Sequence, residues 1–332
     1  ALLGTIGVTG VSGVDNNHFL GPQHIAVYGT MLYITDAGNQ RVQIFDVSTP
    51  AAPVYSATIG VSGVSGTDNL HFDHPVGVAV TADSIYVADR WNNRIQVFSR
   101  ASRTYVTTIG TGWGTANDQF KGPTDVAVDS ARNIYVADFE NCRVQQFNSS
   151  LVYQRTYGFT GEPYLTDGDH YNSPSGVAVA ADGSMYITED NGHRLIKRNA
   201  DGTLAWTIGT AGVKFADWPP ANDNLQNPAD IAINAAGKIY VADQWNSRIQ
   251  VYNPDGTYSA TIGGGTGNYQ FSCPTGLTID KNGYIYVTDC WRHRVQIFNA
   301  AHTYVGTLGV TDVSGSDNAH FNNPSGVAVD SN

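Results

Sequence analysis

The chain has 332 residues, of which only 14% are charged, and its formal net charge at pH 7 is −11. This acidity argues against a nucleic-acid partner, because phosphate binding needs a surplus of lysine and arginine on some face. No apolar run approaches the length of a membrane span, so we expect no membrane insertion. The low charge and the abundance of glycine, serine, threonine and asparagine favour an extracellular or cell-surface β-protein.

A repeat of about fifty residues runs through the whole chain. Residues 1–17 match residues 303–319, so the chain opens on the last strand of a repeat, which predicts a processed or trimmed N-terminus. Six full repeats follow, at about 18–70, 71–119, 120–170, 171–224, 225–270 and 271–319. Residues 320–332 begin a further repeat and stop after its first strand. The uninterrupted repeat predicts one domain over residues 1–332.

Each full repeat contains four short runs rich in β-branched and aromatic residues, and each run predicts a β-strand. In the second repeat these runs cover Val78–Val80, Ile85–Ala88, Ile95–Phe98 and Tyr105–Ile109. Four strands per repeat at this period are typical of propeller blades and not of a helical solenoid. The sequence therefore predicts an all-β fold, a β-propeller of four-stranded antiparallel blades.

Three repeats share one longer motif, P-x-G-V-A-V-x-x-x-x-x-I-Y-V-A-D-x-x-N-x-R-I-Q-V-F. It fits Pro75 to Phe98, Pro123 to Phe147 and Pro228 to Tyr252 closely. This motif resembles the NHL-repeat family, and the resemblance covers essentially the whole chain. It implies a β-propeller, usually of six blades. It implies little about chemistry, because such propellers serve as protein-binding, RNA-binding and enzymatic scaffolds.

The number of blades depends on the incomplete repeats at the two ends. Six full repeats close a ring by themselves, which leaves both end strands surplus. In the alternative, a seven-bladed ring, the chain continues by two more strands and the N-terminal strand completes the last blade. Surplus strands have unpaired edges that bind other strands, so self-association is one expected kind of partnership.

An acid ends the second strand of each repeat, and an arginine follows five residues later. The pairs are Asp36–Arg41, Asp89–Arg94, Asp138–Arg143, Glu189–Arg194, Asp243–Arg248 and Asp289–Arg294. Because the pair recurs in every repeat, we assign it to architecture, with carboxylate and guanidinium hydrogen-bonded within or between blades. The asparagines at positions 39, 92, 141 and 246 suit the backbone angles of the intervening turn.

Tryptophans mark one face of the predicted ring. We name this the long-loop face, because it carries the long connections between blades together with the turns between second and third strands. Trp91, Trp245 and Trp291 each lie two residues after the acid, and Trp113 and Trp218 lie in long connections. Exposed tryptophans would stack on carbohydrate or anchor a protein ligand. In the alternative, each ring folds over its neighbouring loop and is buried.

A second candidate site lies at the mouth of the central channel. The position two residues after each blade's proline holds His24, Asp125 and Asp230 in blades one, three and five, and glycine in the other three. In a six-bladed ring, one imidazole and two carboxylates around the axis would hold a divalent cation or ordered water. In the alternative, these side chains cap backbone amides. We expect no cofactor unless the channel holds this cation.

Two of the three cysteines flank one predicted hairpin. Its turn centres on Asn282-Gly283, which places Cys273 nearly opposite Cys290 and predicts a disulfide within the blade. The alternative is a pair of buried free thiols. Cys142 has no partner. A disulfide would imply an oxidising compartment.

The sequence thus favours a non-catalytic extracellular or cell-surface propeller that binds protein or carbohydrate on its long-loop face, and a structural variant of this prediction is self-assembly through its end strands. The alternative is a metal-dependent lyase or hydrolase in the channel. The amidating lyases, which are propellers of NHL type, hold zinc with channel histidines. Here only His24 lies near a matching place, and Asp125 and Asp230 occupy the equivalents, so that zinc site is not carried over.

Overall fold

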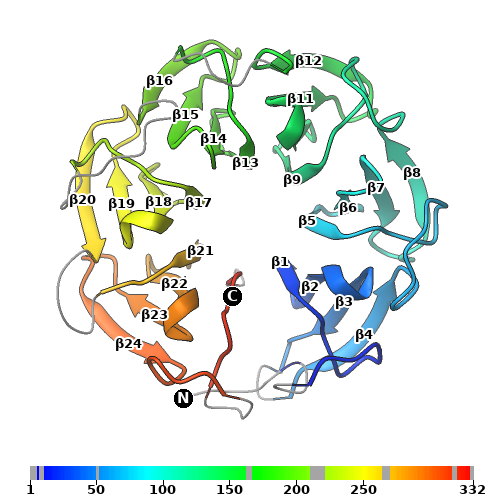
Figure 1. Cartoon of the computed structure of the whole chain (residues 1–332), viewed down its shortest axis with the longest axis horizontal. Coiled ribbons are helices and arrows are strands. Elements are labelled where there is room, and N and C mark those ends of the chain that lie inside the picture. The colour runs from blue at the N-terminus through cyan, green and yellow to red at the C-terminus, as the bar shows by residue number, and fades with distance from the viewer. Residues whose placement is uncertain are drawn as a thin grey trace.

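The computed structural model describes residues 6, 11–49, 52–161, 167–209, 221–263, 270–315 and 320–329. These residues form six separate four-stranded sheets, and the sheets stand around a common axis (Figure 1). Within the described ranges the only helical elements are four short 3-10 turns. The predicted all-β, six-bladed propeller is therefore confirmed.

Each blade takes its four strands consecutively from the chain, with the first strand nearest the axis (Figure 1). Blades one to three contain β1 (Pro22–Tyr28), β2 (Met31–Asp36), β3 (Arg41–Asp46), β4 (Val54–Ile59), β5 (Pro75–Val80), β6 (Ser84–Asp89), β7 (Arg94–Ser99), β8 (Tyr105–Ile109), β9 (Pro123–Val128), β10 (Ile134–Asp138), β11 (Arg143–Phe147) and β12 (Tyr153–Tyr157). Blades four to six contain β13 (Pro174–Val179), β14 (Met185–Glu189), β15 (Arg194–Arg198), β16 (Leu204–Ile208), β17 (Pro228–Ile233), β18 (Ile239–Asp243), β19 (Arg248–Tyr252), β20 (Tyr258–Gly263), β21 (Pro274–Ile279), β22 (Ile285–Asp289), β23 (Arg294–Phe298) and β24 (Tyr304–Leu308). The 3-10 turns are η1 (Ala37–Asn39), η2 (Phe139–Asn141), η3 (Gln244–Asn246) and η4 (Cys290–Arg292), each between a second and a third strand.

The hydrophobic core lies between neighbouring blades. Ile95 and Val97 of β7, for example, pack in one cluster with Val126 of β9 and Val136 of β10. Second strands such as β10 are buried along their full length, because both of their faces meet a sheet. Outer strands are less buried and expose some side chains, such as Val106 of β8. This packing holds the first strands and their loops rigidly around the axis.

The acid–arginine pairs are architectural, as predicted. Arg41 Nε donates to Asp36 Oδ2 at 2.8 Å, and both side chains are fully buried. The remaining donors of Arg41 bind carbonyl groups of the incoming connection, including those of Val14 and Asp15. Similar pairs recur in all six blades. Each arginine thus ties the loop that enters its blade to the turn between its second and third strands.

The expectation for the turn asparagines was wrong in one respect. The left-handed backbone conformation falls on the residue after each asparagine, for example Gln40 with φ 58°. Asn39 instead uses its buried amide to donate to Asp36 Oδ2 at 2.8 Å and to Gly13 O at 2.7 Å. Asparagine is placed there for its side-chain donors, and the turn angle is taken up by its neighbour.

Residues 320–329 lie between blade six and blade one and run toward the axis (Figure 1). Thr275 Oγ1 donates to Pro324 O at 3.2 Å, and Ser325 Oγ donates to Pro22 O at 3.2 Å. The same two repeat positions form the equivalent bond between blades three and four. The segment therefore takes the place of the first strand of a further blade. The N-terminal strand of the seven-bladed alternative lies almost wholly outside the described residues.

Among the described residues, no helix is long and apolar enough to cross a membrane.

Candidate functional site

The tryptophans of the long-loop face are exposed. The exposed fractions of Trp91, Trp113, Trp245 and Trp291 are 59%, 68%, 51% and 64%. Trp245 and Trp291 lie in η3 and η4, and Trp91 lies in the equivalent turn of blade two. The alternative, in which each ring is buried, does not hold for these four residues. Trp218 lies outside the described residues.

Neighbouring side chains orient two of these rings. Trp91 stacks on His74 with 4.5 Å between ring centroids and 11° between ring planes. Burial, followed by the charge of Arg90, lowers the pKa of His74, so the stacked imidazole is neutral at pH 7. Lys121 Nζ lies 4.5 Å from the centroid of the Trp113 ring. Each ring is therefore contacted on one of its faces and leaves the rest of its surface open to solvent.

Other apolar side chains are exposed in the connections of the same face. Leu70 and Phe159 are 68% and 51% exposed, in the connections that lead into blades two and four. Phe159 stacks on His170 with 4.3 Å between ring centroids. Tryptophans and aliphatic residues together give this face several separate apolar contact points.

A central cavity of about 420 Å³ opens around the axis. The structure brings His24, Asp125 and Asp230 to this one cavity, as the repeat spacing predicted. Arg90, Phe139 and a third acidic residue, Asp190, also line the cavity.

The three predicted channel residues tie each blade to the next. Asp125 Oδ2 accepts the backbone N–H of Val177 at 3.0 Å, and Asp230 Oδ2 accepts that of Leu277 at 2.8 Å. His24 Nδ1 accepts the N–H of Val78 at 3.3 Å. Each accepting side chain in an odd blade thus caps the residue that follows the glycine in the next blade. The capping role left open by the sequence is the one that the structure shows.

These three side chains do not form a metal site. In the part of the chain that the structure describes, no three His, Cys, Asp or Glu side chains are grouped closely enough to hold a metal ion. Each carboxylate of the pair Asp125 and Asp230 also accepts the amide of its own following residue. The residues present therefore do not fit a zinc ion held by channel histidines.

The cavity perturbs one carboxyl strongly. Burial raises the pKa of Asp230 to about 6. The amide of Leu277 and the nearby His24 oppose this rise, and the negative charge of Asp125 adds to it. The two carboxylates thus interact unfavourably across the cavity.

Three further residues that line this cavity were not predicted from the sequence. Arg90, Phe139 and Asp190 each directly follow the acid of their second strand, and all three line the cavity. The remaining blades have alanine, glutamine and cysteine at this position. The signal that would have found these residues is the position directly after each acid, which varies from blade to blade although the acid and the following arginine recur, because variation on a rigid scaffold marks recognition.

The predicted disulfide is not formed in the structure, where Cys273 and Cys290 are free thiols, as is the buried Cys142. The hairpin does place the pair side by side, since the N–H of Cys290 donates to Cys273 O at 2.9 Å. Burial, and then the neighbouring Cys273, raises the pKa of the Cys290 thiol to about 11. Register predicted the proximity correctly, but it does not determine whether the two thiols are oxidised.

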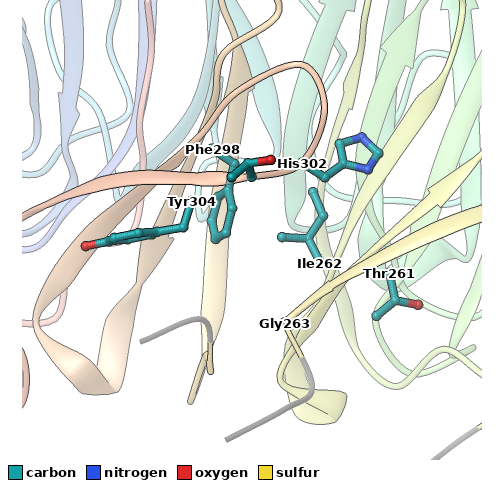
Figure 2. A pocket seen from close by; sticks show the side chains of 7 residues that line it. Thr261, Ile262, Gly263, Phe298, His302 and Tyr304 are labelled. Atoms are coloured by element: carbon teal, nitrogen blue, oxygen red, sulfur yellow. The ribbon is translucent and has the colours of Figure 1, made fainter. Parts of the chain in front are cut away.

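A second cavity of about 260 Å³ lies at the outer edge, between β20 and β24 (Figure 2). Its lining mixes apolar side chains, such as Ile262 and Phe298, with polar ones, such as Thr261. The imidazole of His302 in this lining already bonds Tyr240 Oη through Nε2 at 3.1 Å. None of the predicted site residues lies there.

Comparison with known proteins agrees with this architecture. The NHL repeat family matches residues 72–98, 120–147, 225–252 and 271–298. A streptogramin B lyase structure superposes with a TM-score of 0.66 at 15% identity, covering 92% of this chain and 86% of that one, which shows the fold alone. Repeats, blades and central channel together define a six-bladed β-propeller. The chain belongs to the NHL-repeat β-propellers.

Two curated relatives stand out. The chain is 46% identical over 225 residues to a probable peptidyl-alpha-hydroxyglycine alpha-amidating lyase of Caenorhabditis elegans, which is 65% of this chain and 59% of that protein. It is 33% identical over 88 residues to NHL repeat-containing protein 3 of Homo sapiens, which is 26% of this chain and 23% of that protein. The chain thus spans less than two thirds of the length of either relative.

Proposed function

We propose that this chain is a non-catalytic binding propeller, extracellular or at the cell surface, that recognises a protein through its long-loop face. The observation that carries this proposal is the exposure of Trp91, Trp113, Trp245 and Trp291, each more than half exposed, on one face of a rigid ring. Tryptophan contributes strongly to binding energy at protein interfaces, and leaving four rings in water has no stabilising role.

The spread of these residues favours a protein over a carbohydrate. They lie in blades two, five and six and in the connection into blade three, and Leu70 and Phe159 add apolar contacts between them. A short glycan would reach one or two of these points. A protein surface of about 800 Å² per partner reaches several.

A peptide selection tests the proposal. Peptides selected from a displayed random library on the intact chain are expected to lose most of their binding to a Trp91→Ala/Trp245→Ala variant. A Tyr284→Ala variant serves as the control, because this exposed aromatic lies in the turn between β21 and β22, on the opposite face. Peptides that bind all three proteins equally would contradict the proposal. Glycan-array binding that the tryptophan variant loses would replace the protein ligand with carbohydrate.

A second candidate function is a metal-dependent lyase or hydrolase with its site in the central cavity. It is supported by the similarity to the probable amidating lyase. The cavity residues themselves do not support it, because they form no metal-ligand group in the described ranges. Metal analysis of the purified chain and cleavage of an α-hydroxyglycine peptide test this candidate. A stoichiometric metal whose loss abolishes cleavage would favour it over a binding role.

Self-association through the end strands is a further part of the proposal. Residues 320–329 are docked against blade six and blade one of the same molecule, so they would have to leave this place to link neighbours. We therefore place any link at the N-terminal strand. Light scattering of the chain with and without residues 1–10 tests it, since an oligomer that survives the deletion contradicts this placement.

A further inference from the structure

The central cavity has a cationic side that its architecture does not use. The guanidinium of Arg90 lies 5.5 Å from the centroid of the Phe139 ring, and both residues line the cavity. It forms no ion pair with any carboxylate among the described residues, in contrast to the arginine of every blade's acid–arginine pair. An arginine resting on an aromatic ring keeps its donor edge free for a carboxylate.

The same cavity also carries acidic groups. Both oxygens of Asp230 and of Asp125 already accept one amide each, and an ionised carboxylate has about four acceptor positions. Each of these two carboxylates can therefore accept further hydrogen bonds from a molecule in the cavity. Asp190, which also lines the cavity, is partly buried and accepts a hydrogen bond from Asn227.

The lining carries three carboxylates, of Asp125, Asp190 and Asp230, against the single guanidinium of Arg90. This excess of negative charge favours a cation. Among the described residues, no three His, Cys, Asp or Glu side chains are grouped closely enough to hold a metal ion, so the cation that fits this lining is an organic one. An ammonium group has three donors and reaches separate acceptors through ordinary hydrogen bonds.

We infer that the central cavity binds a small zwitterion, whose ammonium group lies between Asp125 and Asp230 and whose carboxylate meets Arg90. Its volume of about 420 Å³ falls within the usual range of small-molecule sites. The Phe139 ring covers the apolar part of such a molecule beneath the guanidinium. This site is separate from the proposed protein-binding contacts, since none of the described tryptophans lines the cavity.

Three probes of similar length distinguish the contributions of the two charged groups. They are 5-aminopentanoate, which has both groups, pentylamine and pentanoate. Titration calorimetry at pH 7.5 is expected to rank 5-aminopentanoate above the other two. Asp230→Asn should weaken pentylamine and 5-aminopentanoate roughly tenfold and leave pentanoate unchanged. Arg90→Gln should show the reverse, with loss of pentanoate and 5-aminopentanoate and unchanged pentylamine.

Matched controls come from the exposed ion pair of Arg132 with Asp83, outside the cavity. Arg132→Gln and Asp83→Asn should leave all three affinities unchanged. Arg90 crosses the blade boundary only through its contact with the Phe139 ring and caps no backbone amide there, so Arg90→Gln keeps the test valid if Asp230→Asn fails to fold. Absence of binding by all three probes, or binding that neither cavity variant changes, would overturn the inference.

Discussion

The carboxylate of Asp230 in blade five accepts the backbone N–H of Leu277 in blade six at 2.8 Å. The bond crosses the boundary between two sheets, where no backbone ladder exists. Asp125 and Val177 repeat it between blades three and four at 3.0 Å. Alternate blades therefore supply the acceptor, and the blades between them supply a glycine that lets the backbones approach.

This close approach predicts a cost for any side chain at Gly77. A Cβ there would lie 2.8 Å from Asp125 Cα, which is backbone and cannot turn away. We expect Gly77→Ala to lower the free energy of unfolding by about 1–3 kcal/mol, as overpacked sites do. Urea denaturation measures it. Gly306→Ala is the matched control, because nothing lies within 4 Å of its added Cβ. Equal stability of the two variants would mean that the blades separate without cost.

Removing only the arginine of an acid–arginine pair should lower the free energy of unfolding strongly. Arg143 Nε donates to Asp138 Oδ2 at 2.7 Å, with the two side chains 2% and 0% exposed. Arg143→Leu leaves a buried carboxylate without its counter-charge and should cost about 3–5 kcal/mol of unfolding free energy. Arg132→Gln, which breaks an exposed pair, should leave stability nearly unchanged. A small loss at Arg143 would contradict this cost of a buried carboxylate without its counter-charge.

The raised pKa of Asp230 predicts a pH dependence of stability. Its folded value of about 6 lies above the ordinary 3.8, so between these values the folded chain binds the proton more tightly than the unfolded chain. This group therefore lowers the free energy of unfolding as pH rises through that interval. Asp230→Asn should remove that part of the change in melting temperature between pH 4.5 and pH 7. An unaltered profile, matching that of Asp83→Asn, would contradict the shift.

The adjacent thiols Cys273 and Cys290 should form a disulfide under mild oxidation. Oxidised glutathione accepts the two electrons, and each thiol loses its proton as the S–S bond forms. The expected product is an intramolecular bond, measured by mass spectrometry after alkylation, while Cys142 stays alkylatable after unfolding. Cys273→Ser should abolish it. Because burial raises the pKa of both thiols, the reaction should be slow at pH 7 and faster at higher pH. Intermolecular dimers alone would contradict the pairing.

The sequence by itself determined the ring. The predicted runs Ile85–Ala88 and Ile95–Phe98 fall inside β6 (Ser84–Asp89) and β7 (Arg94–Ser99), and the same agreement recurs through the repeats. Strand order and the acid–arginine pairs follow from local periodicity, because each blade is completed by consecutive strands, whereas the choice between six and seven blades came from the structure. Even the convergence of His24, Asp125 and Asp230 on the axis was a consequence of equal spacing.

Only the tertiary structure decided what those residues do. Asp125 and Asp230 reach amides of the next blade, which depends on distances between sheets and not on any repeat position. The exposure of Trp91 and Trp245 depends on how neighbouring connections pack, and those connections are the least regular part of the sequence. Arg90 and Phe139 come from neighbouring blades, and they are in contact because both blades contribute to the lining of one cavity. Periodicity fixes where a residue stands in its blade, whereas its chemistry depends on contacts between blades that no single repeat contains.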